Sequence, residues 1–304
     1  MVLNRFMITP NTLQKGDTVA IVSTARKISK EELMPALQLL ESWGLKAVLG
    51  KTIGAEANQF AGSDDLRTAD FQQMLDDPNI KAIWCARGGY GTVRIIDKLN
   101  FSVFKKNPKW IIGYSDVTVL HSHIHNSGIE TLHAQMCLEI ENKTPETVES
   151  IRKVLFGENY NIEFERKGSL ASLGVIKGQL IGGNLSVLYS LCGSASEMKT
   201  DGKILFIEDL DEMLYHIDRM MVNLKRSGYL RNLKALIIGG MTEMKDNKVY
   251  FGKTAEKIII DLVKEYKYPV ISNFPAGHIR DNRALIMGRE VELNVTENKI
   301  ALSF

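Results

Sequence analysis

Short apolar runs that alternate with helical patterns constrain the fold of this chain more than any other feature of its sequence. Residues 18–24 form a β-branched, largely apolar run, as expected for a strand buried on both faces of a sheet. A capping box at Ser29 and Glu32 then opens a helix that ends at Gly44, and residues 45–49 form the next strand. Because the connections are short, the pattern predicts a right-handed strand–helix–strand crossover and a parallel sheet.

The same alternation continues to the middle of the chain. Helices are predicted at residues 63–75 and 94–99, and strands at residues 80–85 and 110–113. These elements extend the parallel sheet that the first crossover begins.

The second half repeats the alternation after a polar, charged stretch at residues 144–166. We therefore expect a first domain at 1–145, a linker at 146–170 and a second domain at 171–304. Apolar runs predict strands in the second domain, and polar residues mark the starts of its helices. The strands are expected at 174–180, 203–207, 235–240 and 269–271, the helix starts at Asn184, Asp211 and Thr254, and short β-like pieces at 284–304.

Composition limits what the folded protein can do. The 304 residues are 44% apolar and 24% charged, the balance of an ordinary soluble globular protein. With 38 basic and 36 acidic residues the net charge is +2, which gives no electrostatic case for binding nucleic acid or an anionic membrane. Cys85, Cys137 and Cys192 lie far apart without a pattern, so we expect neither disulfides nor a zinc site. Residues 1–15 lack the apolar core of a signal peptide and no run could span a membrane, so a cytoplasmic location is expected.

One predicted strand leads directly to a serine. Apolar residues 110–112 run into Gly113, Ser115 follows, and Asp116 opens a helical pattern. A sharp strand-to-helix turn exposes such a serine beside the free N–H groups of a helix N-terminus, where an oxyanion can be held. The full G-x-S-x-G pattern of a nucleophile elbow is absent because Val117 replaces its second glycine. An ordinary helix N-cap is therefore the alternative interpretation.

A glycine-rich loop follows the strand at residues 80–85. Gly88, Gly89 and Gly91 indicate backbone that approaches another group closely or adopts positive φ. The loop lacks both the dinucleotide fingerprint and the lysine and serine of a P-loop. A phosphate-binding loop, a plain tight turn and an oxyanion loop that supplies an N–H beside Ser115 remain open interpretations.

Several histidines follow Ser115. His121 and His125 share a helical face at a spacing that metal ligands use. No glutamate lies between them in an H-E-x-x-H pattern and no third ligand is evident, so we expect packed or solvated imidazoles and no metal. His133 is a further candidate, for the rim of a site.

Two more polar residues follow apolar strands in the second half. Glu208 comes after the strand at 203–207, and His278 comes after the strand at 269–271. Functional residues of α/β sheets collect at such strand ends, and acyl transfer by a serine needs a base and a carboxylate that orients it. Spacing alone leaves alternatives open, because Glu208 could complement a helix N-terminus and His278 could be a loop histidine bonded to backbone.

Six short segments, within a stretch from about Lys15 to Gly288, carry a combined signature. They are F-A-G-S-D at 60–64, A-R-G-G-Y-G at 86–91, G-Y-S-D at 113–116, G-G-N-L at 182–185, L-F-I-E-D at 205–209 and G-H at 277–278. In this order the segments resemble those of the LD-carboxypeptidase family of serine peptidases. That family includes muramoyltetrapeptide carboxypeptidases and microcin C self-immunity proteins, and several segments together are more specific than any one of them.

The resemblance implies a Ser-Glu-His catalytic triad. Ser115 would be the nucleophile, His278 the base and Glu208 the orienting carboxylate. Glu212 is the alternative carboxylate, and Glu208 is preferred because it ends its strand directly.

The resemblance also implies roles around the triad. The N–H groups of Gly89 and Asp116 would form an oxyanion hole that stabilises charge developing in the transition state. Arg87, Gly88 and Asn184 are candidates for substrate binding, since a free terminal carboxylate needs a cationic or N–H-rich partner. No metal or other cofactor is required.

The fold implied by the resemblance is α/β, with a Rossmann-like N-terminal domain that carries the serine. A smaller, β-rich C-terminal domain would carry the glutamate and the histidine, the site would lie between domains, and homodimers are usual for the murein members. Two departures concern the site wall. The sequence at 133–136 reads H-A-Q-M where many members have H-G-P, and His278 is followed by I-R-D-N without the usual glycine.

The expected function is that of a cytoplasmic LD-carboxypeptidase that removes the terminal D-Ala from murein tetrapeptides in cell-wall recycling. A first alternative is a hydrolase of the same family that cuts microcin C-type acyl-adenylate analogues, which would need an aromatic platform for the base. A second is a non-catalytic protein that binds a phosphate or nucleotide through the loop at 88–91, which leaves Ser115, Glu208 and His278 unexplained.

Overall fold

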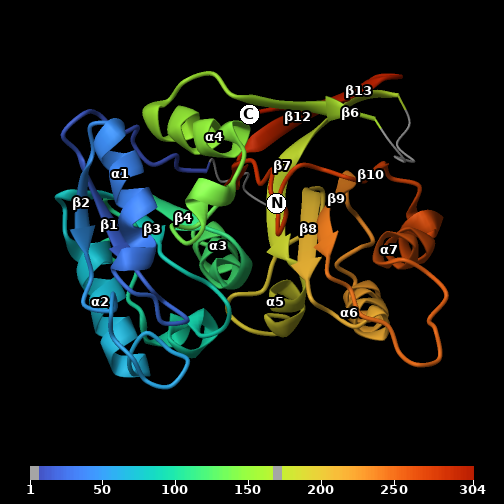
Figure 1. Ribbon diagram of the computed structural model, residues 1–304. Coiled ribbons are helices and arrows are strands. Elements are labelled where there is room, and N and C mark those ends of the chain that lie inside the picture. Colours follow the sequence, from blue (N-terminus) through green and yellow to red (C-terminus); the bar gives the residue numbers. More distant parts are fainter. Residues whose placement is uncertain (1–6, 167–172) are drawn as a thin grey trace.

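The structure, a computed structural model, describes residues 7–166 and 173–304, and its strands within these ranges form two sheets (Figure 1). The first sheet has the strand order β11-β5-β4-β3-β1-β2. Its strands are β1 (Thr18–Val22), β2 (Lys46–Leu49), β3 (Ile80–Cys85), β4 (Trp110–Gly113), β5 (Thr131–His133) and β11 (Leu285–Met287). The strands from β1 to β5 pair in parallel, as predicted, and β11 pairs antiparallel with β5.

Helices cover both faces of this first sheet, which explains its apolar strands. On one face α1 (Met34–Ser42) and α4 (Pro145–Phe156) pack against side chains such as Trp84. On the other face α2 (Asp64–Asp76) and α3 (Thr118–His125) pack against side chains such as Ile83. Successive residues of β3 therefore enter different cores, as the two-residue period of a strand requires.

The second sheet has the strand order β10-β9-β8-β7-β12-β13-β6. Its strands are β6 (Asn161–Glu165), β7 (Gly174–Asn184), β8 (Ile204–Leu210), β9 (Ala235–Thr242), β10 (Val270–Ile271), β12 (Glu290–Val295) and β13 (Lys299–Ser303). The strands from β7 to β10 pair in parallel, whereas β12, β13 and β6 join the sheet antiparallel. The expected α/β fold class, with a parallel-sheet first domain and a β-rich second domain, is confirmed.

The helices of the second half lie beside the parallel part of its sheet (Figure 1). They are α5 (Leu185–Ser190), α6 (Leu214–Arg226) and α7 (Ala255–Val263). Short 3-10 helices complete the described elements: η1 (Glu31–Leu33), η2 (Thr92–Arg94), η3 (Ile96–Lys98), η4 (Ser115–Val117), η5 (Ile140–Asn142) and η6 (Lys264–Tyr266). None of the helices in the described part of the chain is long and apolar enough to cross a membrane.

Caps were predicted correctly at some helix starts and wrongly at others. Ser29 and Glu32 exchange the two hydrogen bonds of a capping box, at 2.8 and 3.2 Å, and Thr254 caps α7. Asp211 does not cap α6, whose N-cap is Met213. Asp211 instead has a left-handed φ of 63° and forms an ion pair with Lys245 at 2.6 Å.

Strand β7 runs four residues further than its apolar pattern predicts. The strand was expected to end at residue 180 but continues through Gly182 and Gly183 to Asn184, and the helix start predicted at Asn184 is confirmed, since Asn184 caps α5. The reason is close packing: a Cβ on Gly182 would collide with the carbonyl oxygen of Phe206, and one on Gly183 would lie 2.5 Å from Thr118 Oγ1. These glycines therefore let β7 lie directly against β8 and against α3 of the first domain.

The segment expected to be a linker carries regular structure where it is described. Helix α4 buries Ile151, Val154 and Leu155 in the core of the first domain, and β6 forms the edge of the second sheet. The chain also returns to the first sheet through β11. The domain division at 1–145, 146–170 and 171–304 stays a proposal. Residues 285–287, which belong to the proposed second domain, pair with β5 in the first sheet.

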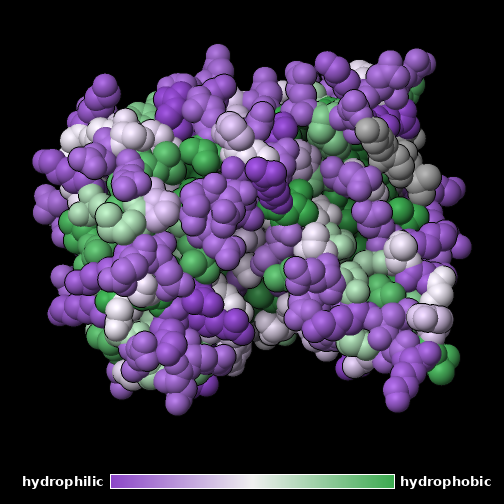
Figure 2. Space-filling view, in the orientation of Figure 1, coloured by the Kyte–Doolittle hydropathy of each residue, from purple (hydrophilic) through white to green (hydrophobic). Residues whose placement is uncertain are grey.

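Figure 2 shows hydrophilic side chains over most of one face and a notch between the two lobes.

Candidate active site

Ser115 stands on a strained turn at the end of β4. Its φ of 62° lies in the left-handed region, which non-glycine residues seldom occupy and which clusters at functional sites. Val117 fits at the position of the missing second glycine because Gly113 has no side chain. A Cβ on Gly113 would lie 2.8 Å from Val117 Cγ2. The turn therefore has the shape of a nucleophile elbow with only one of its two glycines.

The glycine-rich loop after β3 lies next to this turn. A Cβ on Gly88 would be 3.5 Å from the Cβ of Ser115, and Gly89 has a φ of 105°. The buried carboxylate of Asp116 accepts a hydrogen bond from the N–H of Thr92 at 2.9 Å, which ties the end of the loop to the serine turn. Among the loop and turn hydrogen bonds within residues 7–166 and 173–304, none is donated by the Gly89 or Asp116 N–H, so both are candidates to face an oxyanion.

A buried arginine fixes the other side of the same loop. Arg67 is 1% exposed and donates to the carbonyl oxygens of Thr24 and Gly91, at 2.6 and 2.9 Å. A charged donor that satisfies two buried carbonyls holds their backbone firmly. Arg67 therefore fixes the end of the glycine-rich loop at Gly91.

Glu208 and His278 form a hydrogen-bonded pair in the second domain. His278 Nδ1 lies 2.6 Å from Glu208 Oε2, and the backbone N–H of His278 donates to the same oxygen at 3.1 Å. Glu208 lies within β8 rather than after it, and its side chain is fully buried. A Cβ on Gly277 would lie 2.7 Å from the Cβ of Glu208, so only glycine permits this approach.

Each partner changes the pKa of the other. Burial works to raise the pKa of Glu208, but the charge and hydrogen bond of His278 outweigh it and hold that pKa below its ordinary value. Burial works to lower the pKa of His278, but the charge and hydrogen bond of Glu208 raise it above its ordinary value. A carboxylate beside an imidazole of raised basicity is the arrangement of a general base with its orienting group.

Tyr114 of the first domain contacts His278 of the second. Its ring lies 4.7 Å from the imidazole of His278, centroid to centroid, and it is the residue directly before Ser115. Within the described residues no hydrogen bond joins Ser115 to His278. Hydrogen bonds between catalytic groups are often long without substrate, so this geometry is compatible with a serine–histidine pair that closes on binding. Tyr114 was not singled out in the sequence, although it lies inside the G-Y-S-D segment.

The two departures from the family pattern meet in space. The backbone N–H of Gly277 donates to Asn282 Oδ1 at 2.8 Å, and Asn282 Nδ2 donates to Gln135 Oε1 at 3.3 Å. Gln135 Nε2 in turn donates to the carbonyl oxygen of Leu138 at 2.9 Å. Asn282 and Gln135 are both buried, at 0% and 2% exposed. This chain of hydrogen bonds anchors the His278 loop to the first domain.

His133 lies in the core, not at the rim where it was expected. It is fully buried, with its ring 5.2 Å from Phe206 and 5.9 Å from Tyr114. Within the described part of the chain neither ring nitrogen has a hydrogen-bond partner, and neither has Oε1 of Glu208. Burial lowers the pKa of His133 to about 4, so its imidazole is neutral at physiological pH.

The remaining candidates have other partners. Glu212 Oε2 lies 2.6 Å from Nδ1 of His216, so it does not orient His278. Asn184 is the N-cap of α5, where its oxygen accepts from Val187 N–H and Ser186 Oγ and its amide donates to buried Asp209.

Arg87, the candidate cation of the glycine-rich loop, donates to the carbonyl oxygen of Lys27 at 3.0 Å. Its guanidinium also lies 3.9 Å from the carboxylate of Glu32. Arg87 is therefore already engaged by other groups of the chain.

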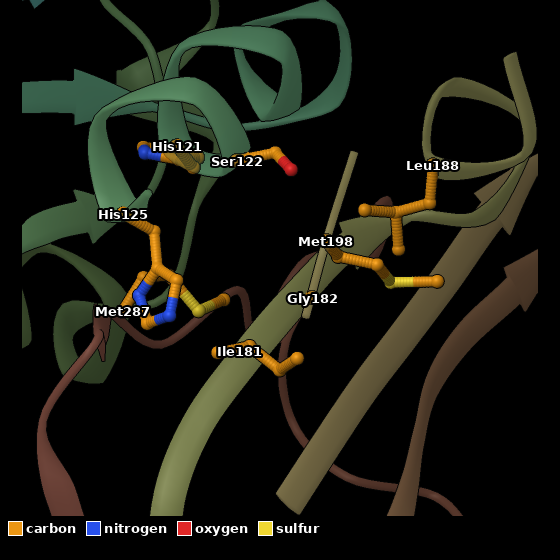
Figure 3. Close-up of a pocket in the computed structure, with 8 residues that line it drawn as sticks. All are labelled: His121, Ser122, His125, Ile181, Gly182, Leu188, Met198 and Met287. Atoms are coloured by element: carbon orange, nitrogen blue, oxygen red, sulfur yellow. The ribbon is translucent and has the colours of Figure 1, made fainter. Parts of the chain in front are cut away.

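The histidines of α3 are packed between the domains. His121 bonds to Thr131 Oγ1 and to the carbonyl oxygen of Gly113, both at 2.8 Å, and His125 Nε2 lies 2.8 Å from Lys203 Nζ. Figure 3 shows both among the residues that line a small cavity, together with Ile181 and Gly182 of β7. In the described residues no group of three or more histidine, cysteine or carboxylate side chains could hold a metal.

Comparisons with known proteins cover nearly the whole chain. The family model described as the LD-carboxypeptidase N-terminal domain matches residues 19–134, and that of the C-terminal domain matches residues 177–293. The Bacillus subtilis protein named "Probable murein peptide carboxypeptidase" is 36% identical over 95% of this chain and 92% of its own. The "Microcin C7 self-immunity protein MccF" of Escherichia coli is 24% identical over 96% of this chain and 94% of its own.

A solved structure agrees with these matches. The crystal structure of muramoyltetrapeptide carboxypeptidase from Oxalobacter formigenes superposes with a TM-score of 0.85 at 26% identity, over 94% of this chain and 97% of that one. Both family models and the identity to the Bacillus subtilis protein thus lead to one conclusion. This chain belongs to the LD-carboxypeptidase family and is a hydrolase of the serine carboxypeptidase class.

Proposed function

We propose that this protein is a cytoplasmic LD-carboxypeptidase that removes the terminal D-Ala from murein tetrapeptides during cell-wall recycling. The observation that carries the proposal is the contact of Tyr114 with His278, which puts the Glu208–His278 pair beside the serine turn. The names of the Bacillus subtilis and Oxalobacter formigenes proteins support a murein peptide as substrate. We also propose that the protein is a homodimer, as the resemblance implies.

In the proposed mechanism Ser115 Oγ attacks the carbonyl carbon before D-Ala and transfers its proton to His278. Glu208 holds His278 in the required tautomer, since Nδ1 faces its carboxylate. The N–H groups of Gly89 and Asp116 stabilise the oxyanion. His278 then protonates the leaving amine of D-Ala, and water hydrolyses the acyl-enzyme with His278 again as base.

Substrate contacts are proposed for the loop after β3. Gly88 lies beside Ser115, and Arg87 is the residue directly before Gly88. We therefore propose that both contact a bound peptide. Asn184 is the weaker candidate because its side chain already caps α5 and bonds to Asp209.

The test is release of free D-Ala from a murein tetrapeptide by the wild type and by Ser115→Ala, without added metal. We expect release by the wild type and a kcat about 10⁶-fold lower in the variant, as for other serine nucleophiles. A circular dichroism spectrum that matches the wild type would show that the variant is folded. Release by both proteins would contradict the serine mechanism.

A second substrate, assayed beside the tetrapeptide, tests the alternative activity of MccF-like proteins. An acyl-adenylate analogue needs a stacking surface for its base, and Tyr189 is the one aromatic residue between positions 174 and 201. Its ring packs edge-on against His216 within the second domain. Cleavage of an aminoacyl sulfamoyl adenosine without D-Ala release from tetrapeptide would favour the MccF-like activity over the murein one.

A further inference from the structure

Arg26 lies across the glycine-rich loop that faces Ser115. A Cβ on Gly89 would be 2.6 Å from Arg26 Cδ and 2.7 Å from its Nε, so the side chain runs directly over the backbone of Gly89. Its own backbone is fixed there. The N–H of Arg26 donates to the carbonyl oxygen of Gly88 at 3.4 Å, and its carbonyl oxygen accepts from Ser23 Oγ at 2.6 Å. The stem of the Arg26 side chain therefore lies against Gly89, whose N–H is a proposed donor of the oxyanion hole.

Three cations gather at this rim, and they differ in their partners. Lys27 is paired with Glu56 at 2.9 Å. Arg87 lies 3.9 Å from Glu32 and donates to a backbone carbonyl. Arg26 is exposed, and within the described residues its guanidinium has neither an ion pair nor a hydrogen bond. Arg26 is thus the cation of the rim that remains available to a ligand.

A carboxypeptidase has to recognise a carboxylate very close to the bond it cuts. The leaving group is a single amino acid, so its carboxylate carbon is two bonds from the scissile nitrogen. A cation that binds it must lie beside the nucleophile and the oxyanion hole, and an arginine can bind both carboxylate oxygens at once.

We propose that Arg26 binds the terminal carboxylate of the substrate and restricts the enzyme to peptides with a free C-terminus. This inference rests on the proposed function and assigns the carboxylate contact to Arg26 in place of Arg87 or Asn184. Because Gly89 lacks a side chain, the guanidinium can lie over the loop without displacing the N–H that faces the oxyanion. The missing side chain at position 89 therefore serves both the oxyanion hole and the carboxylate site.

The experiment compares two substrates: a murein tetrapeptide that ends in D-Ala and the same peptide ending in D-alaninamide. The kcat/KM for each is measured by release of the last residue. We expect the wild type to prefer the free acid. Arg26→Gln should lower kcat/KM for the acid by about 10- to 100-fold, the range expected for a lost charged hydrogen bond, and leave the amide unchanged. Arg26→Lys keeps the charge but loses the bidentate geometry, so its kcat/KM for the acid should lie between those of the wild type and Arg26→Gln.

Lys27→Gln is the matched control, since it removes the adjacent charge, which already has a carboxylate partner. It should keep the preference for the acid. A preference that persists in Arg26→Gln, or that is lost in Arg87→Gln but not in Arg26→Gln, would overturn this inference while leaving the proposed function intact. If the wild type released no D-Ala from the acid, the proposed function itself would fail and the inference with it.

Discussion

The serine side and the histidine side of the candidate site are built in different ways. Ser115, its turn and Asp116 belong to one short stretch, and the strained φ of Ser115 is held by packing between neighbours such as Gly113 and Val117. On the histidine side, Glu208 and His278 are 70 positions apart, and the loop of His278 is tied through Asn282 to Gln135, 147 positions away. Local sequence forms the turn of the proposed nucleophile, whereas contacts across the whole chain position the proposed base.

This difference predicts which substitutions should disrupt the serine side and which the histidine side. The serine turn should be most sensitive to changes at residues close to it in the sequence, such as Gly113 and Val117. The histidine loop should fail when distant residues change, because Glu208 of the same domain holds His278 and the bond from Asn282 to Gln135 holds the loop against the first domain.

The largest effect on the histidine side should come from Glu208→Gln. An amide in place of the carboxylate cannot stabilise the imidazolium of His278 or fix its tautomer, so kcat should fall by about 10⁴-fold. Glu212→Gln tests the competing assignment and should leave kcat within about twofold, because Glu212 pairs with His216. Steady-state D-Ala release measures both. A large loss in Glu212→Gln with little loss in Glu208→Gln would transfer the role to Glu212.

A smaller effect is expected from Gln135→Leu, in the first domain. The change leaves the buried amide of Asn282 without its partner and loosens the His278 loop, so kcat should fall by about 10- to 100-fold. Gln72→Leu is the control, since it breaks similar bonds to Asp76 and Asn100 far from the site and should not change kcat. If Gln135→Leu lowered only the melting temperature and left kcat unchanged, the amide chain would be structural alone.

The smallest effect is expected in the pH profile of the wild type. His278 must be neutral to accept the serine proton, and Glu208 raises its pKa above 6.5. Activity should therefore be complete at high pH and fall as the pH drops through a midpoint above 6.5. His121 and His133 cannot account for this loss of activity, because burial lowers their pKa values to about 3 and about 4. A midpoint in kcat/KM at or below 6.5 would show that the Glu208–His278 pair is not formed in the free enzyme.

Much of the fold could be read from the sequence because it depends on short periodic patterns. The β-branched runs predicted the parallel strands, and the capping box at Ser29 and Glu32 formed as expected. Predictions failed where a distant contact overrides the local pattern. Strand β7 continues through Gly182 because β8 lies against it, and Asp211 is drawn into an ion pair with Lys245 instead of capping α6.

The site residues divide in the same way. Ser115 and the glycine-rich loop stood out because a strand end, a turn and a helix start are contiguous in the sequence. Arg26 gave no such signal, since its importance arises only from its position over Gly89. Gln135 and Asn282 were noticed as separate departures from the family pattern, and their hydrogen bond became visible only in the structure.

The sequence by itself determined the alternation of strands and helices, the parallel sheet of the first half, the serine turn and the family, because each depends on short local patterns. Only the tertiary structure decided that Glu208 rather than Glu212 faces His278, that His133 is buried, and that Arg26, which has no ion pair within residues 7–166 and 173–304, lies over the loop. The physical reason is range: propensity and capping act within a turn or two of chain, whereas hydrogen bonds, burial and charge pairing depend on distances that folding sets.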